Sequence, residues 1–144
     1  MALKTDAVGK EWPGTTYQVG REKIKEYANA LGIDNPVHHD VGEAHRAGFR
    51  DVVAPPMFAA VYCGPAIWPA LTDPELGVDF ARLVHGAQEF TWGEPVVAGD
   101  EVTTEAQLDE RSERGGLKFY VFKTTSTNQR GELVSEGRWT NIVR

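Results

Sequence analysis

Two adjacent histidines, His38 and His39, follow an Asn-Pro pair in the first third of the chain. A neutral imidazole can accept a proton near pH 7, so this residue type suits general acid–base chemistry. Asp34 lies just before Asn35-Pro36, where aspartate is a common turn and cap residue. The two imidazoles are therefore the groups in this stretch whose chemistry suits proton transfer.

The other reactive side chains give little indication of nucleophilic catalysis or metal binding. Cys63 is the one cysteine and lies in an apolar run, where cysteine is usually a packing residue rather than a nucleophile. It also leaves no possibility of an intrachain disulfide. The spacing of His38, His39 and His45 matches no usual zinc motif, and no cysteine pair accompanies them. We expect neither a metal site nor a cofactor.

An apolar helix after Pro56 is the element best suited to position these groups. The run from Met57 to Cys63 is apolar on nearly every side, which predicts a buried helix. The amino-terminal end of a buried helix can stabilise developing negative charge. Gly64-Pro65 predicts a kink or an end, because proline removes a helical hydrogen bond and clashes with the preceding turn.

Two more helices flank the histidines. Residues 21–31 repeat apolar side chains at helical spacing and end at Gly32. Asp40 with Glu43 three residues later predicts a capped short helix, and Gly48 is the residue type that ends one.

The second half of the chain alternates apolar and polar residues with the period of a strand. Trp12-Pro13-Gly14 is expected to be a turn before a short first strand. Gly115-Gly116 predicts a hairpin. We expect an antiparallel meander and an α+β fold, in which a curved sheet wraps around the long helix. The chain is read as one domain, 1–144. The expected strands span residues 15–19, 84–92, 102–108, 117–127 and 133–143.

Composition restricts the partners. The 144 residues include 41% hydrophobic and 25% charged residues, which is typical of a soluble globular protein. The net charge of −6 argues against nucleic acid or an anionic membrane as the main partner. No run has the length of a membrane span, and residues 1–10 lack the apolar core of a signal peptide. We expect a cytoplasmic protein.

Five motifs follow one another in a fixed order along the chain. They are Arg21-Glu22-Lys23-Ile24, Asn35-Pro36-Val37-His38, Gly48-Phe49, Val53-Ala54-Pro55-Pro56-Met57-Phe58 and Val84-His85-Gly86 leading to Glu89-Phe90. On these motifs the chain resembles the MaoC-like hotdog-fold family, which includes (R)-specific enoyl-CoA hydratases and 3-hydroxyacyl-thioester dehydratases. It is more specifically similar to the actinobacterial FAS1-like dehydratases, some of which are subunits of heterodimeric 3-hydroxyacyl-ACP dehydratases.

The resemblance implies a fold and a reaction. A highly curved antiparallel sheet would surround a helix starting near Pro56, and two such units would pair into a continuous sheet. An acyl-CoA or acyl-ACP substrate would enter a tunnel near the interface of a homodimer, or of a heterodimer with a second MaoC-like chain. Further residues would bind the thioester: Asn35, Pro56, Met57, Phe58, His85 and Gly86.

Not every functional residue of the family has an equivalent in this sequence. The family's catalytic histidine falls on His38, with His39 as a solvated neighbour, and a register shift of one residue would exchange the two. The family's acid falls on Ile33, which cannot transfer a proton. Asp34, one residue later, could substitute for it, although aspartate is also a common turn residue there. The family's glycine at the start of the central helix falls on Pro56, which has no N–H, so the Met57 N–H would have to bind the oxyanion. Three readings stay open: a self-sufficient hydratase or dehydratase, a subunit that needs a partner's acid and base, and a hotdog thioesterase or acyl-thioester binder.

Overall fold

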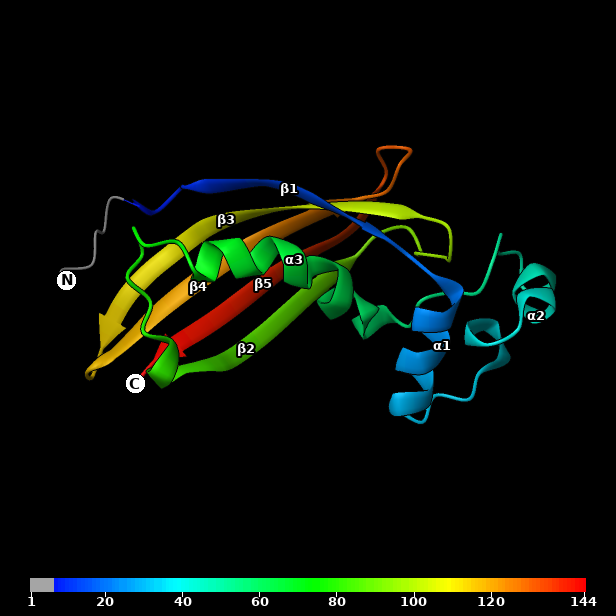
Figure 1. Cartoon of the computed structure of the whole chain (residues 1–144), viewed down its shortest axis with the longest axis horizontal. Helices are drawn as coiled ribbons and strands as arrows, with labels where there is room; N and C mark the ends of the chain where they lie inside the picture. Colours follow the sequence, from blue (N-terminus) through cyan, green and yellow to red (C-terminus); the bar gives the residue numbers. More distant parts are fainter. Residues whose placement is uncertain (1–6) are drawn as a thin grey trace.

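The computed structural model describes residues 7–144; residues 1–6, part of the segment inspected for a signal peptide, lie outside this range. Five antiparallel strands form one sheet in the order β1-β3-β4-β5-β2. The sheet is curved, and the longest helix lies along its concave side (Figure 1). This arrangement confirms the expected α+β fold. The strands are β1 (Glu11–Gln18), β2 (Leu83–Trp92), β3 (Glu101–Arg114), β4 (Leu117–Thr127) and β5 (Leu133–Val143).

The central helix α3 (Ala59–Leu71) follows directly from a 3₁₀ turn, η3 (Pro56–Phe58). It does not end at Gly64-Pro65, where the sequence predicted a kink or an end. Tyr62, Cys63 and Ala66 are buried against the sheet, and this packing outweighs the one helical hydrogen bond that proline removes.

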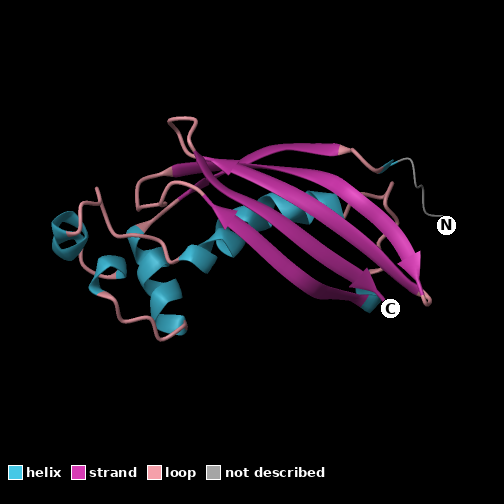
Figure 2. Cartoon of the chain, turned by 180° about the vertical axis from the view of Figure 1, so that it is seen from behind, coloured by secondary structure: helices cyan, strands magenta, loops and turns pink. Residues whose placement is uncertain are grey.

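The remaining helices, except η4, gather beyond the amino-terminal end of α3, at one end of the sheet (Figures 1 and 2). Asp40 caps α2 by accepting the Glu43 N–H at 2.8 Å, as the sequence predicted. Gly48 follows this helix with a positive φ of 93°, a conformation that favours glycine. The helices are α1 (Arg21–Ala30), η2 (Pro36–His38), α2 (Val41–Arg46) and, at the opposite end of the sheet, η4 (Phe80–Arg82).

The prediction of a turn at Trp12-Pro13-Gly14 is wrong. These residues belong to β1, and the pairing register with β3 shifts between Trp12 and Thr15. A bulge on an edge strand accommodates Pro13, because a proline there removes no hydrogen bond that the ladder needs.

The prediction of a four-strand meander is also wrong in part. β3, β4 and β5 are consecutive neighbours, but β2 pairs with β5 rather than with β3. After β2, the chain crosses the end of the sheet, where Gly93 N–H donates to the Val134 carbonyl at 2.9 Å and Val53 pairs with Val97. This crossing segment, residues 93–99, reaches the loop that follows His38.

Candidate functional site

His38 is held with a defined ring orientation. It ends η2, whose start is capped by the Asn35 side chain accepting the Val37 N–H at 3.2 Å. The His38 side chain is buried, and its Nδ1 lies 2.6 Å from the Val53 carbonyl oxygen. A carbonyl can only accept, so Nδ1 carries the hydrogen and Nε2 is left to gain or lose a proton.

A cavity of about 480 Å³ adjoins His38, at the amino-terminal end of the central helix. Of the residues predicted from the sequence, it brings together Asn35, His38 and Pro56. Most of its wall is apolar, as an acyl chain would require. The lining residues are Asn35, Val37, His38, Phe49, Val53, Ala54, Pro55, Pro56, Tyr62, Trp92, Gly93, Glu94, Pro95, Val96 and Val134.

Met57 and Phe58 lie beside this cavity without lining it. Met57 is 43% exposed, whereas Phe58 is completely buried and makes an edge-to-face contact with Tyr27 at 5.5 Å between ring centroids. The Pro56 carbonyl accepts a hydrogen bond from Trp92 Nε1 at 2.9 Å. This bond ties the end of β2 to the start of the central helix.

Asp34 lies in a different depression. That depression also has a volume of about 480 Å³ and includes Ile33, His39 and Asp40 among its lining residues. His39 Nε2 lies 2.7 Å from the Ile33 carbonyl oxygen. Asp34 therefore does not line the cavity of His38.

His85 and Gly86 lie at the other end of β2 from Trp92, and seven residues of strand correspond to about 23 Å. His85 is exposed, and its Nε2 lies 3.0 Å from the Ala87 carbonyl oxygen. Gly86 lies where the register with β5 shifts, and a Cβ there would come within 2.5 Å of Ile142 Cδ1. Within one chain these two residues are far from His38.

Asp100 anchors the loop that supplies Phe49 to the cavity. Its fully buried carboxylate accepts hydrogen bonds from Arg50 Nη2 at 2.8 Å, Gln129 Nε2 at 2.9 Å and the Val97 N–H at 3.0 Å. Burial by itself raises the pKa of Asp100, but these hydrogen bonds outweigh it and hold the pKa below its usual value. Sequence patterns do not mark Asp100 as a supporting residue, because two of its partners, Arg50 and Gln129, are distant in the sequence.

Tyr62 closes the cavity on the helix side. Its hydroxyl forms a 2.7 Å hydrogen bond with Ser135 Oγ, and both residues are buried. Burial raises the pKa of Tyr62 well above its ordinary value, so the phenol stays neutral. The sequence does not distinguish Tyr62 from its neighbours, because the apolar run around it predicts only a core position.

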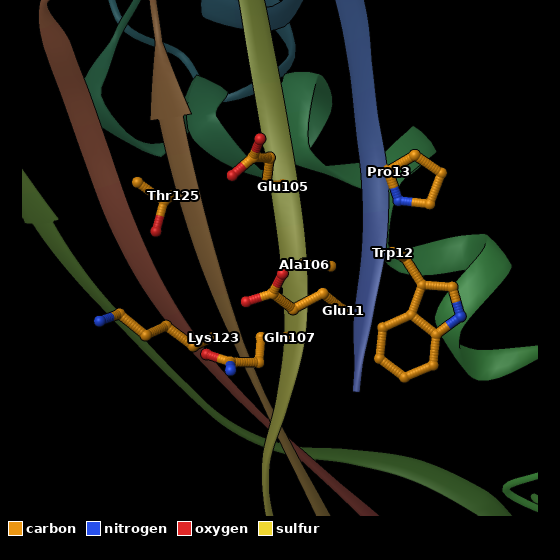
Figure 3. A pocket seen from close by; sticks show the side chains of 8 residues that line it. All are labelled: Glu11, Trp12, Pro13, Glu105, Ala106, Gln107, Lys123 and Thr125. Carbon is orange, nitrogen blue, oxygen red and sulfur yellow. The ribbon is translucent and has the colours of Figure 1, made fainter. Parts of the chain in front are cut away.

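A further hollow of about 360 Å³ lies over β1, β3 and β4, and its lining is more polar than that of the cavity beside His38. Figure 3 shows the side chains of Glu11, Glu105 and Lys123 there, on three neighbouring strands. None of the predicted site residues lines this hollow. Among residues 7–144, no group of three or more His, Cys, Asp or Glu side chains is arranged to hold a metal ion. No helix in this part of the chain is long and apolar enough to cross a membrane.

Comparisons with known proteins identify a family and a fold to which this chain is similar. The family described as FAS1-like, dehydratase domain region, matches residues 6–137. A "UPF0336 protein" of Saccharopolyspora erythraea is 39% identical over 145 residues, covering 100% of this chain and 93% of the relative. A chain of the HadBC (3R-hydroxyacyl-ACP dehydratase) complex from Mycobacterium tuberculosis superposes with a TM-score of 0.85 at 30% identity, covering 97% of this chain and 99% of that one.

A more distant structure shares the fold. The R-hydratase PhaJ1 from Pseudomonas aeruginosa superposes with a TM-score of 0.75 at 22% identity, over 94% of this chain and 81% of that chain. The architecture is thus the hotdog arrangement of these dehydratases.

Proposed function

From the premise that the chain belongs to the FAS1-like dehydratase family of MaoC-like hotdog proteins, we propose that it binds a fatty acyl thioester. We propose further that it takes part in dehydrating (R)-3-hydroxyacyl thioesters, or in the reverse hydration of enoyl thioesters, in cytoplasmic fatty acid metabolism. The reaction needs proton transfer at two adjacent carbons and a donor for the thioester oxyanion, and neither requires a cofactor.

The observation that carries this proposal is the orientation and position of the His38 ring. Its Nδ1–H is committed to the Val53 carbonyl, and it lines an apolar cavity at the start of the central helix. A base of defined tautomer beside an apolar channel suits removal of a proton from an acyl chain. Pro56 has no N–H, so we assign the oxyanion contact to the Met57 N–H at the first turn of this helix.

The partner is proposed to be a second MaoC-like chain, in a homodimer or a heterodimer. Strand β2 is an edge of the sheet and has backbone groups free for another strand. Beside it, Trp68 and Phe80 are exposed and their rings pack at 5.6 Å. An acyl-CoA and an acyl-ACP share the same phosphopantetheine arm, so either carrier fits the proposal.

The test measures binding and turnover separately. A short trans-2-enoyl-CoA is titrated into the purified chain by calorimetry, and its hydration is then followed. His38→Ala should retain binding and lower kcat by about 100-fold or more, because general base catalysis contributes at least that factor. His39→Ala is the matched control, since its imidazole lies outside the cavity. Failure to bind enoyl-CoA and acyl-ACP alike, or full turnover by His38→Ala, would refute the proposal.

A second function is favoured by one observation. Ile33 occupies the position of the family's acid, and Asp34 lies outside the cavity. Binding without turnover would therefore identify the chain as the acyl-binding subunit of a dehydratase whose partner supplies the catalytic pair. Release of free CoA thiol in the same assay would instead indicate a thioesterase.

A further inference from the structure

The hydration of an enoyl thioester needs two proton-transfer groups in one cavity. Water loses a proton as its oxygen bonds to C3, and C2 gains a proton as the carbon–carbon double bond becomes single. If His38 Nε2–H supplies the proton to C2, a second group must accept the proton from water. A carboxylate is the usual choice, and it returns the proton to the imidazole after each turnover.

Among the described residues that line the cavity of His38, Glu94 is the one carboxylate. The other acidic residues near this cavity either form ion pairs or line a different depression. Asp100 and Asp51 are held in ion pairs with Arg50 and Arg21, at 2.8 Å each. Asp34 and Asp40 line the separate depression of His39. No ion pair among residues 7–144 involves Glu94, so its charge is available to a ligand.

The backbone holds Glu94 in a rigid corner. The N–H groups of Gly93 and Glu94 donate to the carbonyls of Val134 and Leu133, both at 2.9 Å. A Cβ at Gly93 would collide with the Leu133 carbonyl, so only glycine fits there. Pro95 fixes φ on the other side.

The same segment also holds the loop that orients His38. Ala54 N–H donates to the Val96 carbonyl at 2.8 Å, and Val53 pairs with Val97. Val53 is the residue whose carbonyl binds the His38 ring. Two residues therefore separate Glu94 from the backbone that supports the histidine, while the Glu94 side chain is exposed where it lines the cavity.

We propose that Glu94 is the carboxylate partner of His38, in place of the acid missing at Ile33. This inference rests on the proposed function. In hydration, the Glu94 carboxylate takes a proton from water, the water oxygen bonds to C3, and His38 Nε2–H protonates C2. Dehydration is the exact reverse: His38 takes the C2 proton and Glu94 protonates the departing hydroxyl. The chain then needs no acid from a partner.

The experiment compares three isosteric variants for hydration of a short trans-2-enoyl-CoA, with binding measured on each by calorimetry. Glu94→Gln should lower kcat by about 100-fold while the dissociation constant stays within about threefold, because the side chain keeps its size and loses its basicity. Asp34→Asn tests the rival carboxylate. Glu105→Gln, in the hollow over β3, is the matched control.

The outcomes separate this inference from the function on which it rests. A loss in Asp34→Asn that exceeds the loss in Glu94→Gln would overturn the assignment. So would a purified wild-type chain that binds the thioester and does not turn it over, although such a chain would still be an acyl-binding dehydratase subunit. A chain that binds no thioester would refute both. A loss confined to His38→Ala and Glu94→Gln supports both.

Discussion

The two ends of strand β2 differ in how their buried polar groups are held. At the cavity end, around Trp92, the Asp100 carboxylate has three donors and Tyr62 bonds to Ser135. At the far end, around His85, Arg111 Nε, Ser112 Oγ and Asn141 Nδ2 are buried with no hydrogen-bond partner among the described residues. A histidine is present near each end, so residue type alone does not make a site. What distinguishes the cavity end is a set of fully paired supporting groups.

The largest expected difference between the two ends is the loss of stability when a carboxylate is removed, because the carboxylate at the cavity end is buried. Asp100→Ala leaves Arg50, Gln129 and the Val97 N–H without an acceptor, and should lower the free energy of unfolding by about 3 kcal/mol. The melting temperature should then fall by roughly 10 °C in calorimetry. Glu113→Gln is the far-end counterpart, because Glu113 pairs with Arg111 at 2.8 Å but is exposed. Equal losses in the two variants would contradict the comparison.

The next contrast uses Gly86, near the start of β2, and Gly93, just after its end. A Cβ at Gly93 meets the Leu133 backbone, which cannot move aside, whereas the closest atoms to a Cβ at Gly86 are Cδ1 and Cγ1 of the Ile142 side chain. Gly93→Ala should cost about 2 kcal/mol and Gly86→Ala about 1 kcal/mol in urea unfolding. Ile142→Val removes the closer colliding atom, Cδ1, so Gly86→Ala should cost less in an Ile142→Val background than in the wild type. Failure of this rescue would show that the far end is as rigid as the cavity end.

The smallest expected effect is a change in the pH dependence of stability. The folded-state pKa of Asp100 is below its unfolded value, so its contribution is present above the unfolded pKa and is lost as the pH falls through the folded one. Asp100→Asn should flatten the decline in the free energy of unfolding, measured by urea denaturation between about pH 5 and pH 3, by less than about 1.4 kcal/mol per pH unit. If the slope of stability against pH is unchanged in this variant, the other ion-paired acids dominate the pH dependence.

Local patterns predicted many elements well. The strands at 117–127 and 133–143 match the sequence prediction at both ends, and helix α1 differs from its predicted range only at the last residue. Periodicity, caps and turn glycines depend on neighbours within a few residues, and these are visible in the sequence. The choice of His38 also came from a local motif. Its catalytic role stays a prediction.

The sequence by itself determined the elements, the α+β class and the family motif that marks His38. Only the tertiary structure decided that β2 pairs with β5, that Trp12-Pro13-Gly14 is a bulge, and that Asp34 lies outside the cavity while Glu94 lines it. The tautomer of His38 likewise depends on Val53, fifteen residues away. The physical reason is that sheet order and cavity walls arise from contacts between distant segments, which depend on how whole elements pack together.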